Sequence, residues 1–143
     1  MTDQPNQYKF DEIKIGLEYK FTEMITESHL DSFANLSGDY NPLHMDAGYA
    51  KTTRFKKRIC HGMLLASFFS KLVGMYLPGK NALYFSQTIN FQNPCFVDDT
   101  ITVRGQVVDK SDTTKIITLN TSIHNQHAMC LVDGTAKVMI RQD

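Results

Sequence analysis

The chain has 143 residues, a formal net charge of zero and a sequence pI near 7.0. That length suits one ordinary domain with a real hydrophobic core, so residues 1–143 are interpreted as a single domain whose polar first segment, residues 1–9, is expected to be loose. A chain with zero net charge lacks the overall basic surface that binds a phosphate backbone, which argues against nucleic acid as the main partner and leaves a local basic patch open.

The first third of the chain predicts one strand followed by two helices. Residues 17–25 alternate apolar and polar side chains, which is typical of a half-buried strand. Thr26 can cap a helix that Gly38 ends. The apolar face of this helix is formed by Leu30, Phe33 and Ala34. A second, short helix is expected within residues 46–53, with Asp46 as its N-cap.

Residues 62–77 are nearly all apolar and predict one long, buried central helix. A helix of that length spans about 24 Å, which is short for a membrane span. The polar residues Ser67, Ser70 and Lys71 also interrupt the run, so we expect no membrane span. Pro78 and Gly79 stop the helix.

The rest of the chain predicts strands joined by short turns. Apolar and polar side chains alternate over residues 83–91, 101–107 and 117–123, and a last strand covers 128–140 with a bulge at Asp133-Gly134. Such strands pair antiparallel. The predicted fold class is therefore α+β, a sheet of about five strands wrapped on one apolar helix. Because this leaves much of the sheet uncovered, we expect a homodimer.

Three cysteines, Cys60, Cys95 and Cys130, show no motif spacing. An odd number without a pattern indicates reduced thiols in a cytoplasmic protein, two or three of them buried. The N-terminal segment does not combine a basic start, an apolar run and a small-residue cleavage site, so we expect no secretion.

Residues 37–44 read Ser-Gly-Asp-Tyr-Asn-Pro-Leu-His and place a carboxylate and an imidazole on either side of a proline turn. Pro42 fixes its own φ and pushes Asn41 out of the helical region. A turn there can bring Asp39 and His44 to one water, with Asn41 orienting one of them by a hydrogen bond. The alternative is a helix end followed by an Asx-type turn, with His44 a satisfied histidine.

Gly62 opens the central helix and has two interpretations. Unpaired N–H groups and the dipole at a helix start favour negative charge, and glycine lets a ligand approach the backbone. Such donors would stabilise an enolate oxygen as it forms. Alternatively, Gly62 only permits close packing. We expect the preceding His61 to be structural, acting through its backbone rather than its ring.

Five basic residues and no acidic one occupy residues 51–58. Arg54, Lys56 and Lys57 in this stretch could meet the phosphates of a nucleotide-bearing ligand, although a solvated loop is the alternative. His124 and His127 lack partners at metal-ligand spacing, so no metal site is predicted. His29, on the first helix, is expected to be exposed.

Together the two motifs resemble those of the MaoC-like family, the (R)-specific or type-2 enoyl-CoA hydratases. The first family motif is similar to residues 37–44 followed by Tyr49-Ala50, and the second is similar to residues 61–64. A third mark resembles residues 91–101. The resemblance covers roughly residues 12–140, and the short single-domain form is most similar to the bacterial hydratases that supply polyhydroxyalkanoate synthesis.

The resemblance implies a hot-dog fold, a long central helix wrapped by an antiparallel sheet, that dimerises through its sheets. It implies that Asp39 and His44 are the catalytic pair and that the Gly62 N–H polarises a thioester carbonyl. Ser70 and Val73 match positions that line the acyl pocket. The implied reaction converts trans-2-enoyl-CoA to (R)-3-hydroxyacyl-CoA. Coenzyme A then enters as part of the acyl-CoA substrate, and no separate cofactor is expected.

Three other functions stay open on the sequence. One is dehydration of 3-hydroxyacyl groups on acyl carrier protein, which keeps the fold and changes the carrier. A thioesterase fits less well, because its water attacks the carbonyl carbon. The third is a non-catalytic subunit that binds acyl-CoA, against which the intact Asp39 and His44 pair argues.

Overall fold

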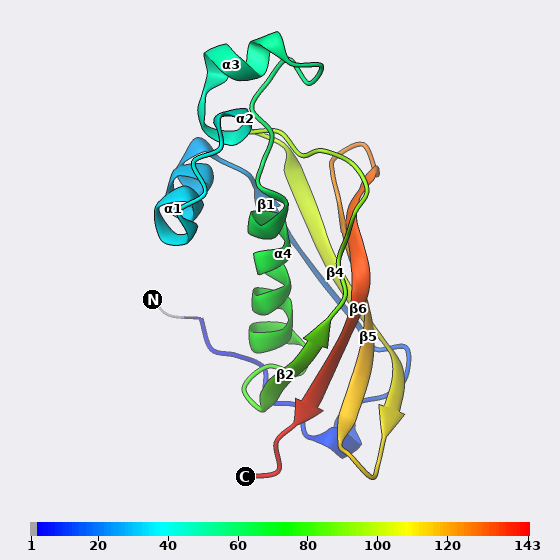
Figure 1. Ribbon diagram of the computed structural model, residues 1–143. Coiled ribbons are helices and arrows are strands. Elements are labelled where there is room, and N and C mark those ends of the chain that lie inside the picture. Colours follow the sequence, from blue (N-terminus) through cyan, green and yellow to red (C-terminus); the bar gives the residue numbers. More distant parts are fainter. Residues whose placement is uncertain (1–2) are drawn as a thin grey trace.

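The computed structural model of the protein describes residues 3–143, and a six-stranded antiparallel sheet curves around a central helix (Figure 1). Helices and strands follow one another as a 3₁₀ turn Phe10–Glu12, β1 Glu18–Met24, α1 Glu27–Ser37, α2 Pro42–Met45, α3 Ala47–Thr52, α4 Gly62–Lys71, a π-helical turn Leu72–Tyr76, β2 Ala82–Gln87, β3 Asn90–Phe91, β4 Thr100–Ser111, β5 Ile116–His124 and β6 Cys130–Ile140. This confirms the predicted α+β class and the hot-dog arrangement.

The sheet has the order β1-β4-β5-β6-β2, and the two-residue strand β3 also pairs with β6. The expected strand over residues 83–91 is therefore divided in two, which makes six strands where about five were predicted. Helix α4 lies against the concave face of the sheet, and α1, α2 and α3 form a separate cap near its N-terminal end (Figure 1). The start of α4 thus lies where the cap meets the sheet.

Two clusters of buried side chains make the core along the central helix. The cluster at the cap end includes Leu65 and Phe69 of α4 packed with Val103, Ile123 and Val132 of the sheet. The other cluster surrounds Val73 and Leu77 and includes Phe10, Ile13, Val107, Ile117 and Val138. Burial in these two clusters explains why the central helix is apolar on most sides. None of the helices in residues 3–143 is long and apolar enough to cross a membrane.

The end of the central helix differs from its prediction over residues 62–77. Regular α-helix stops at Lys71, and a π-helical turn covers Leu72–Tyr76, where the Leu77 N–H donates to the Leu72 carbonyl at 2.9 Å. Both Leu72 and Val73, at the start of this wider turn, are buried.

The predicted bulge at Asp133-Gly134 is wrong, because both residues pair in regular register with Ser122 and Thr121. The register shift lies instead between Ile123 and His124 of β5, which pair with Val132 and Cys130 of β6. Gly134 serves another purpose: a Cβ there would lie 1.8 Å from the Thr88 carbonyl oxygen. The glycine lets the link between β2 and β3 press against β6.

The prediction of a loose segment over residues 1–9 is wrong for residues 6–8, while residues 1–2 lie outside the described part. The Asn6 N–H donates to the Met75 carbonyl at 2.9 Å, and Gln7 forms a β-bridge with Gly79. The Tyr8 and Tyr19 hydroxyls share a hydrogen bond of 2.8 Å. These contacts fasten the segment to the end of the central helix and to β1.

Candidate active site

The loop after α1 carries both side chains of the first motif. Gly38 ends α1 in the left-handed region at φ 81°, and Asp39 follows directly. Asn41 then caps α2, since its side-chain oxygen accepts the Leu43 N–H at 3.0 Å, and Pro42 is the first helical residue. The expected proline turn is therefore the start of a one-turn helix, and His44 lies on that helix.

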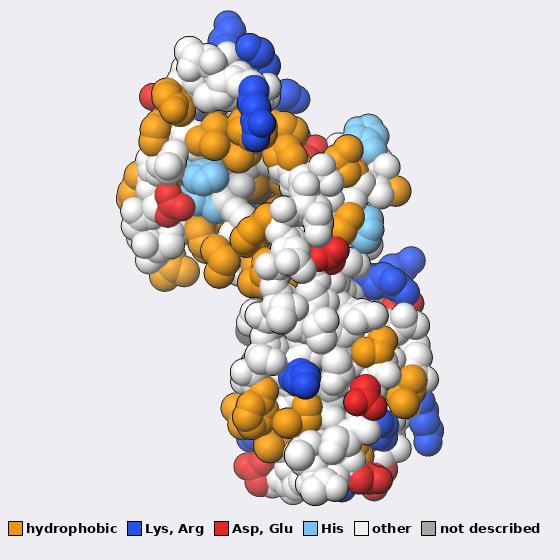
Figure 2. All heavy atoms as spheres, turned by 45° about the vertical axis from the view of Figure 1, so that its right-hand side comes forward, with side chains coloured by type: hydrophobic (Ala, Val, Ile, Leu, Met, Phe, Trp, Pro, Cys, Tyr) orange, Lys and Arg blue, Asp and Glu red, His pale blue; other side chains and the backbone are white. Residues whose placement is uncertain are grey.

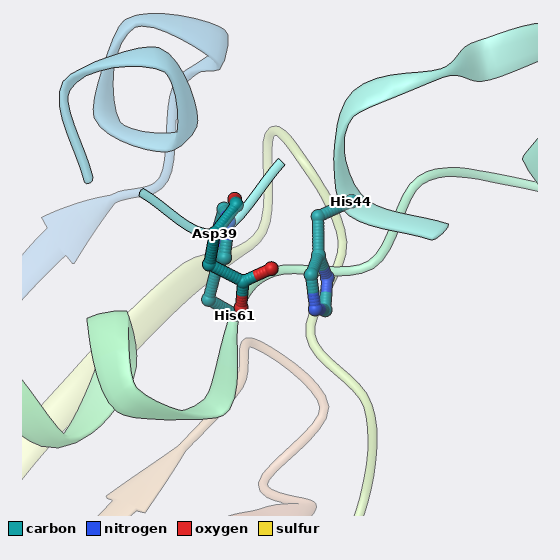
Figure 3. A group of neighbouring side chains, drawn as sticks. All are labelled: Asp39, His44 and His61. Carbon is teal, nitrogen blue, oxygen red and sulfur yellow. The ribbon is translucent and has the colours of Figure 1, made fainter. Parts of the chain in front are cut away.

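Asp39, His44 and the ring of His61 form one cluster. Each offers one nitrogen or oxygen atom, and these atoms lie within 4.8 Å of one another. A carboxylate oxygen of Asp39 points toward the His44 ring (Figure 3). The structure thus brings the carboxylate and the imidazole close together, and their action on one water stays a prediction. Asn41 orients Asp39 through its backbone, whose N–H donates to Asp39 Oδ1 at 3.1 Å, while its side chain caps the helix that carries His44.

The position of His44 is fixed by two bonds to the chain that leads into α4. Its Nδ1 lies 2.8 Å from the Ile59 carbonyl oxygen. Because a carbonyl only accepts, the neutral ring carries its proton on Nδ1 and has its lone pair on Nε2. The His44 carbonyl accepts from Arg58 Nε at 2.5 Å. Arg58 therefore points inward and holds α2, unlike a residue of a fully solvated basic loop.

The expectation that His61 acts only through its backbone is wrong. Its ring is only 2% exposed, stacks on the His44 ring at 4.2 Å between centroids, and meets Phe33 at 4.9 Å. Its Nε2 lies 3.0 Å from the Asp39 carbonyl oxygen, so Nε2 carries the proton. Burial is the main cause that lowers the pKa of His61. The ring is therefore neutral at pH 7.

A second histidine also departs from its prediction. His29 is half-buried rather than exposed, because its Nδ1 accepts the Thr26 N–H at 3.0 Å while the Thr26 hydroxyl accepts the His29 N–H. The two residues make a reciprocal cap for α1. The His29 ring also meets Phe68 of α4 edge-on. This role belongs to the fold and not to the site.

Gly62, the first residue of α4, adjoins the cluster. The N–H groups of the first helical turn have no acceptor inside the helix, and the dipole favours negative charge there. A Cβ on Gly62 would lie 2.7 Å from the Phe91 ring. Glycine is therefore required for the ring of Phe91 to lie over the helix start, which supports the close-packing interpretation, while the role of Gly62 as an oxyanion donor stays a prediction.

A cavity of about 420 Å³ opens beside these residues. Its polar side holds Asp39, His44 and Gly62, and its inner wall is apolar. The buried wall residues are Cys60, Leu65, Cys95, Leu131 and Val132. In the space-filling view, histidine and acidic side chains lie next to a hollow edged by hydrophobic side chains, with basic side chains above (Figure 2). Such a cavity suits an apolar chain that ends in a polar reacting group.

The two cysteines of the wall face each other across a short bridge, where the Cys60 N–H donates to the Cys95 carbonyl at 2.7 Å. Cys60, Cys95 and Cys130 are all free thiols, and the first two are buried, as predicted. A hydrogen bond with Cys60, together with burial, raises the pKa of Cys95. The Cys95 thiol therefore stays protonated and unreactive at neutral pH.

The structure separates the other predicted site residues. Arg54 lines the cavity, whereas Lys56 and Lys57 are exposed on the same loop outside the lining. Ser70 and Val73 are not part of this cavity: Ser70 is exposed, and Val73 is buried in the core cluster at the far end of the central helix. Ser70 lies five residues beyond Leu65 of the cavity wall, and Val73, in the π-helical turn, lies eight residues beyond it.

Sequence reasoning missed several lining residues. Phe55, Met63, Gln92, Leu131 and Val132 all line the cavity. The sequence indicates only that the apolar residues among them are core or strand positions. An alternating pattern does not predict which strand end lies beside the start of a helix. For residues 91–95 the sequence predicts only the end of a strand at Phe91 and part of the third family mark, residues 91–101.

The same three clustered side chains are the residues that would hold a metal ion if the site bound one. Two imidazoles on one ion direct their in-plane lone pairs toward a common point, at about 2.0–2.1 Å for zinc. The rings of His44 and His61 stack at an interplanar angle of 29° instead. The arrangement therefore suits proton transfer better than metal binding, and the prediction of no metal stays a prediction.

Comparisons with known proteins bear on this site. The family model described as MaoC like domain matches residues 10–128. The chain is 39% identical to the (R)-specific enoyl-CoA hydratase of Aeromonas caviae over 128 residues, which cover 90% of this chain and 96% of that protein.

Solved structures agree with the sequence relatives. The unliganded R-hydratase PhaJ1 from Pseudomonas aeruginosa is similar with a TM-score of 0.94 and 35% identity, covering 99% of this chain and 90% of that one. The (R)-hydratase from A. caviae involved in PHA biosynthesis is similar with a TM-score of 0.88 and 39% identity, covering 90% and 97%. The similarity thus runs over nearly the whole length of each chain.

Proposed function

The chain belongs to the MaoC-like family, and from this premise we propose that it is a hydro-lyase that converts trans-2-enoyl-CoA to (R)-3-hydroxyacyl-CoA. One observation carries the proposal. The Asp39 carboxylate and the His44 ring meet beside the start of α4, at the mouth of a cavity whose inner wall is apolar. An acyl chain fits such a wall, and a thioester fits the polar mouth.

The chemistry follows from what each group can do. Hydration adds a hydroxyl at C3 and a proton at C2 of the enoyl group, and negative charge grows on the thioester oxygen as the C3–O bond forms. The N–H of Gly62 donates to that oxygen. Asp39 and His44 hold one water between them, remove its proton as the oxygen attacks C3, and return a proton to C2. The face of C3 that the water attacks sets the configuration, and the proposed product is the (R) isomer.

The carrier is proposed to be coenzyme A, bound as part of the substrate with no further cofactor. Arg54 lines the cavity, and Lys56 and Lys57 lie exposed on the same loop. Their charges suit the phosphates of the CoA moiety. We place this reaction in the cytoplasm, where a reducing environment keeps buried thiols such as Cys60 and Cys95 free. The product would serve polyhydroxyalkanoate synthesis, as in the PHA-related relative.

We further propose that the protein is a homodimer. Strand β2 lies at the edge of the sheet and exposes large apolar side chains. These are Leu83, Tyr84 and Phe85, with Phe91 of β3 beside them. An exposed apolar edge strand is a site for pairing with another chain, and a second copy of the same edge would cover it with matching chemistry.

Crotonyl-CoA added to the purified protein tests the function. We expect the absorbance of the conjugated enoyl group to fall, and chiral analysis of the product to give the (R) isomer. Asp39→Asn and His44→Gln should each lower kcat by about 10²- to 10⁴-fold with the fold intact. Thiol release without hydration would instead indicate a thioesterase. A kcat/KM that is higher for acyl carrier protein thioesters than for CoA thioesters would change the proposed carrier.

A further inference from the structure

His61 is placed between the two halves of the site, and nothing in its sequence motif explains the burial of its ring. We propose that His61 is a positioning residue that holds the loop carrying Asp39 and His44 at a fixed distance from the oxyanion donor of α4. The inference rests on the proposed hydratase function, because it assigns His61 a part in that reaction.

The first step is connectivity. His61 is the residue before Gly62, so its backbone leads directly into the helix start that faces the thioester oxygen. Its side chain reaches the other half of the site, where Nε2–H donates to the Asp39 carbonyl at 3.0 Å across 22 residues of chain. His61 is therefore bonded covalently to Gly62, the proposed oxyanion donor, and by a hydrogen bond to Asp39, a member of the proposed proton-transfer pair.

The second step is the stacked ring. The His61 ring stacks on His44 at 4.2 Å between centroids and also meets Phe33 of α1 at 4.9 Å. His44 is fixed at one edge by the Ile59 carbonyl, so the stack fixes its tilt. The ring of His61 thus supports the orientation of the His44 imidazole as well as the position of the Asp39 backbone.

The third step is an unfavourable feature that stability alone does not explain. The Nδ1 of His61 is buried and has no hydrogen-bond partner among residues 3–143. A buried acceptor without a partner lowers stability, and a phenyl ring would fill the same space without this penalty. The hydrogen bond from its Nε2–H to the Asp39 carbonyl explains why a histidine occupies this position.

Two variants separate the ring from the N–H group. His61→Phe keeps an aromatic ring under His44 and removes the donor to Asp39. His61→Gln keeps an N–H donor near the position of Nε2 and removes the ring. For His61→Phe we expect kcat with crotonyl-CoA to fall about 10- to 100-fold, the effect of a small misplacement of reacting groups, while KM changes less than about threefold and the melting temperature is equal to or above that of the wild type.

For His61→Gln we expect a kcat between those of His61→Phe and the wild type, because the tether to Asp39 is restored. Ile117→Val, in the core cluster far from the site, is the control for a general loss of packing: it should lower the melting temperature and leave kcat unchanged. His61→Phe with wild-type kcat would overturn the proposal, as would a loss of kcat that only follows the fraction unfolded.

A measurement on the wild-type protein keeps the test independent of whether the variants fold. Nitrogen-15 NMR of the histidine rings should show His61 as a neutral ring protonated on Nε2 at pH 7. A ring protonated on Nδ1 alone would contradict the tether, because Nε2 could then not donate to the Asp39 carbonyl. If the wild type does not hydrate crotonyl-CoA, the proposed function fails, while the NMR result still reports whether the contact exists.

Discussion

At the scale of single residues, the site consists of groups whose surroundings differ in kind. Asp39 is exposed to solvent, His44 is half-buried with its Nδ1 on a carbonyl, and His61 is enclosed. The exposed carboxylate and the Nε2 of His44 are the groups a water can reach. The enclosed ring exchanges no proton with substrate, which leaves it free to act as a fixed support.

Gly62→Ala tests the oxyanion donor. A methyl group at this position would lie 2.7 Å from the Phe91 ring. Because the atoms it would meet lie at the far end of the flexible Phe91 side chain, which can swing away, we expect the fold to persist. The methyl group would keep the thioester oxygen from the helix start, and kcat should fall about 10²-fold or more, measured with crotonyl-CoA.

Gly74→Ala is the matched control, because a Cβ there meets nothing within 4 Å. It should retain wild-type kcat. An unchanged kcat in Gly62→Ala would remove the helix start from the mechanism.

The buried ring of His61 also predicts how stability depends on pH. Burial lowers its pKa, as do the neighbouring charges of His44 and Arg58, against the opposing effects of the bond to the Asp39 carbonyl and the Asp39 charge. Below about pH 6.5 His61 therefore binds a proton in the unfolded chain, whereas in the folded protein it stays neutral until a lower pH. The free energy of unfolding should fall in this range as pH falls, by up to about 1.4 kcal/mol per pH unit.

Urea unfolding of the wild type and of His61→Phe between about pH 7.5 and 5 measures this contribution. The variant lacks the titrating ring, so its stability should decline less steeply. If the free energy of unfolding changed with pH to the same extent in the two proteins, His61 would be protonated equally in the folded and unfolded states, and the prediction would fail.

At the scale of elements, the single turn of α2 is the part of the site that depends most on one cap. Asn41 caps α2, and α2 carries His44. Asn41→Ala should lower the free energy of unfolding by about 1 kcal/mol and lower kcat as well, because His44 loses its fixed helix. Asn41→Asp is the control, since aspartate caps equally well, and it should keep both values. Circular dichroism during urea unfolding and the crotonyl-CoA assay provide the two measurements.

Local patterns predicted most of the elements, and the failures share one cause. The Thr26 and Asp46 caps, the end of α1 at Gly38 and the strands over 101–107 and 117–123 were all predictable, because capping and alternation act over a few residues. The bulge, the division of residues 83–91 into two strands and the π-helical turn were not. Each depends on which backbone lies alongside, and that information is nonlocal.

The site was predictable to a similar depth. The motifs identified Asp39, His44 and Gly62, because their residue types fit proton transfer and oxyanion binding. They did not identify the role of the His61 ring, whose meaning depends on the Asp39 carbonyl and the His44 ring. Ser70 and Val73 came from resemblance alone, and the cavity of the described chain is lined instead by residues such as Leu65 and Leu131.

At the scale of the whole molecule, the uncovered edge of the sheet predicts self-association. Phe85 on β2 is 57% exposed. Phe85→Asp should place charges at the centre of the proposed contact and convert the dimer into a monomer, as measured by light scattering during size-exclusion chromatography. Leu36→Asp on α1, where another apolar side chain is 87% exposed, should leave the dimer intact. A wild-type protein that elutes as a monomer at all concentrations would refute the proposal.

His61 donates its hydrogen bond to the main-chain oxygen of residue 39, and a substitution of the side chain leaves that oxygen in place. A single nucleotide change that turned the aspartate into asparagine would leave the tether, the stacked rings and the apolar wall in place. The result would be an inert relative that still has the shape to accept an acyl thioester. Evolution can thus derive a carrier or a sensor from this catalyst in one step, without first having to rebuild the scaffold.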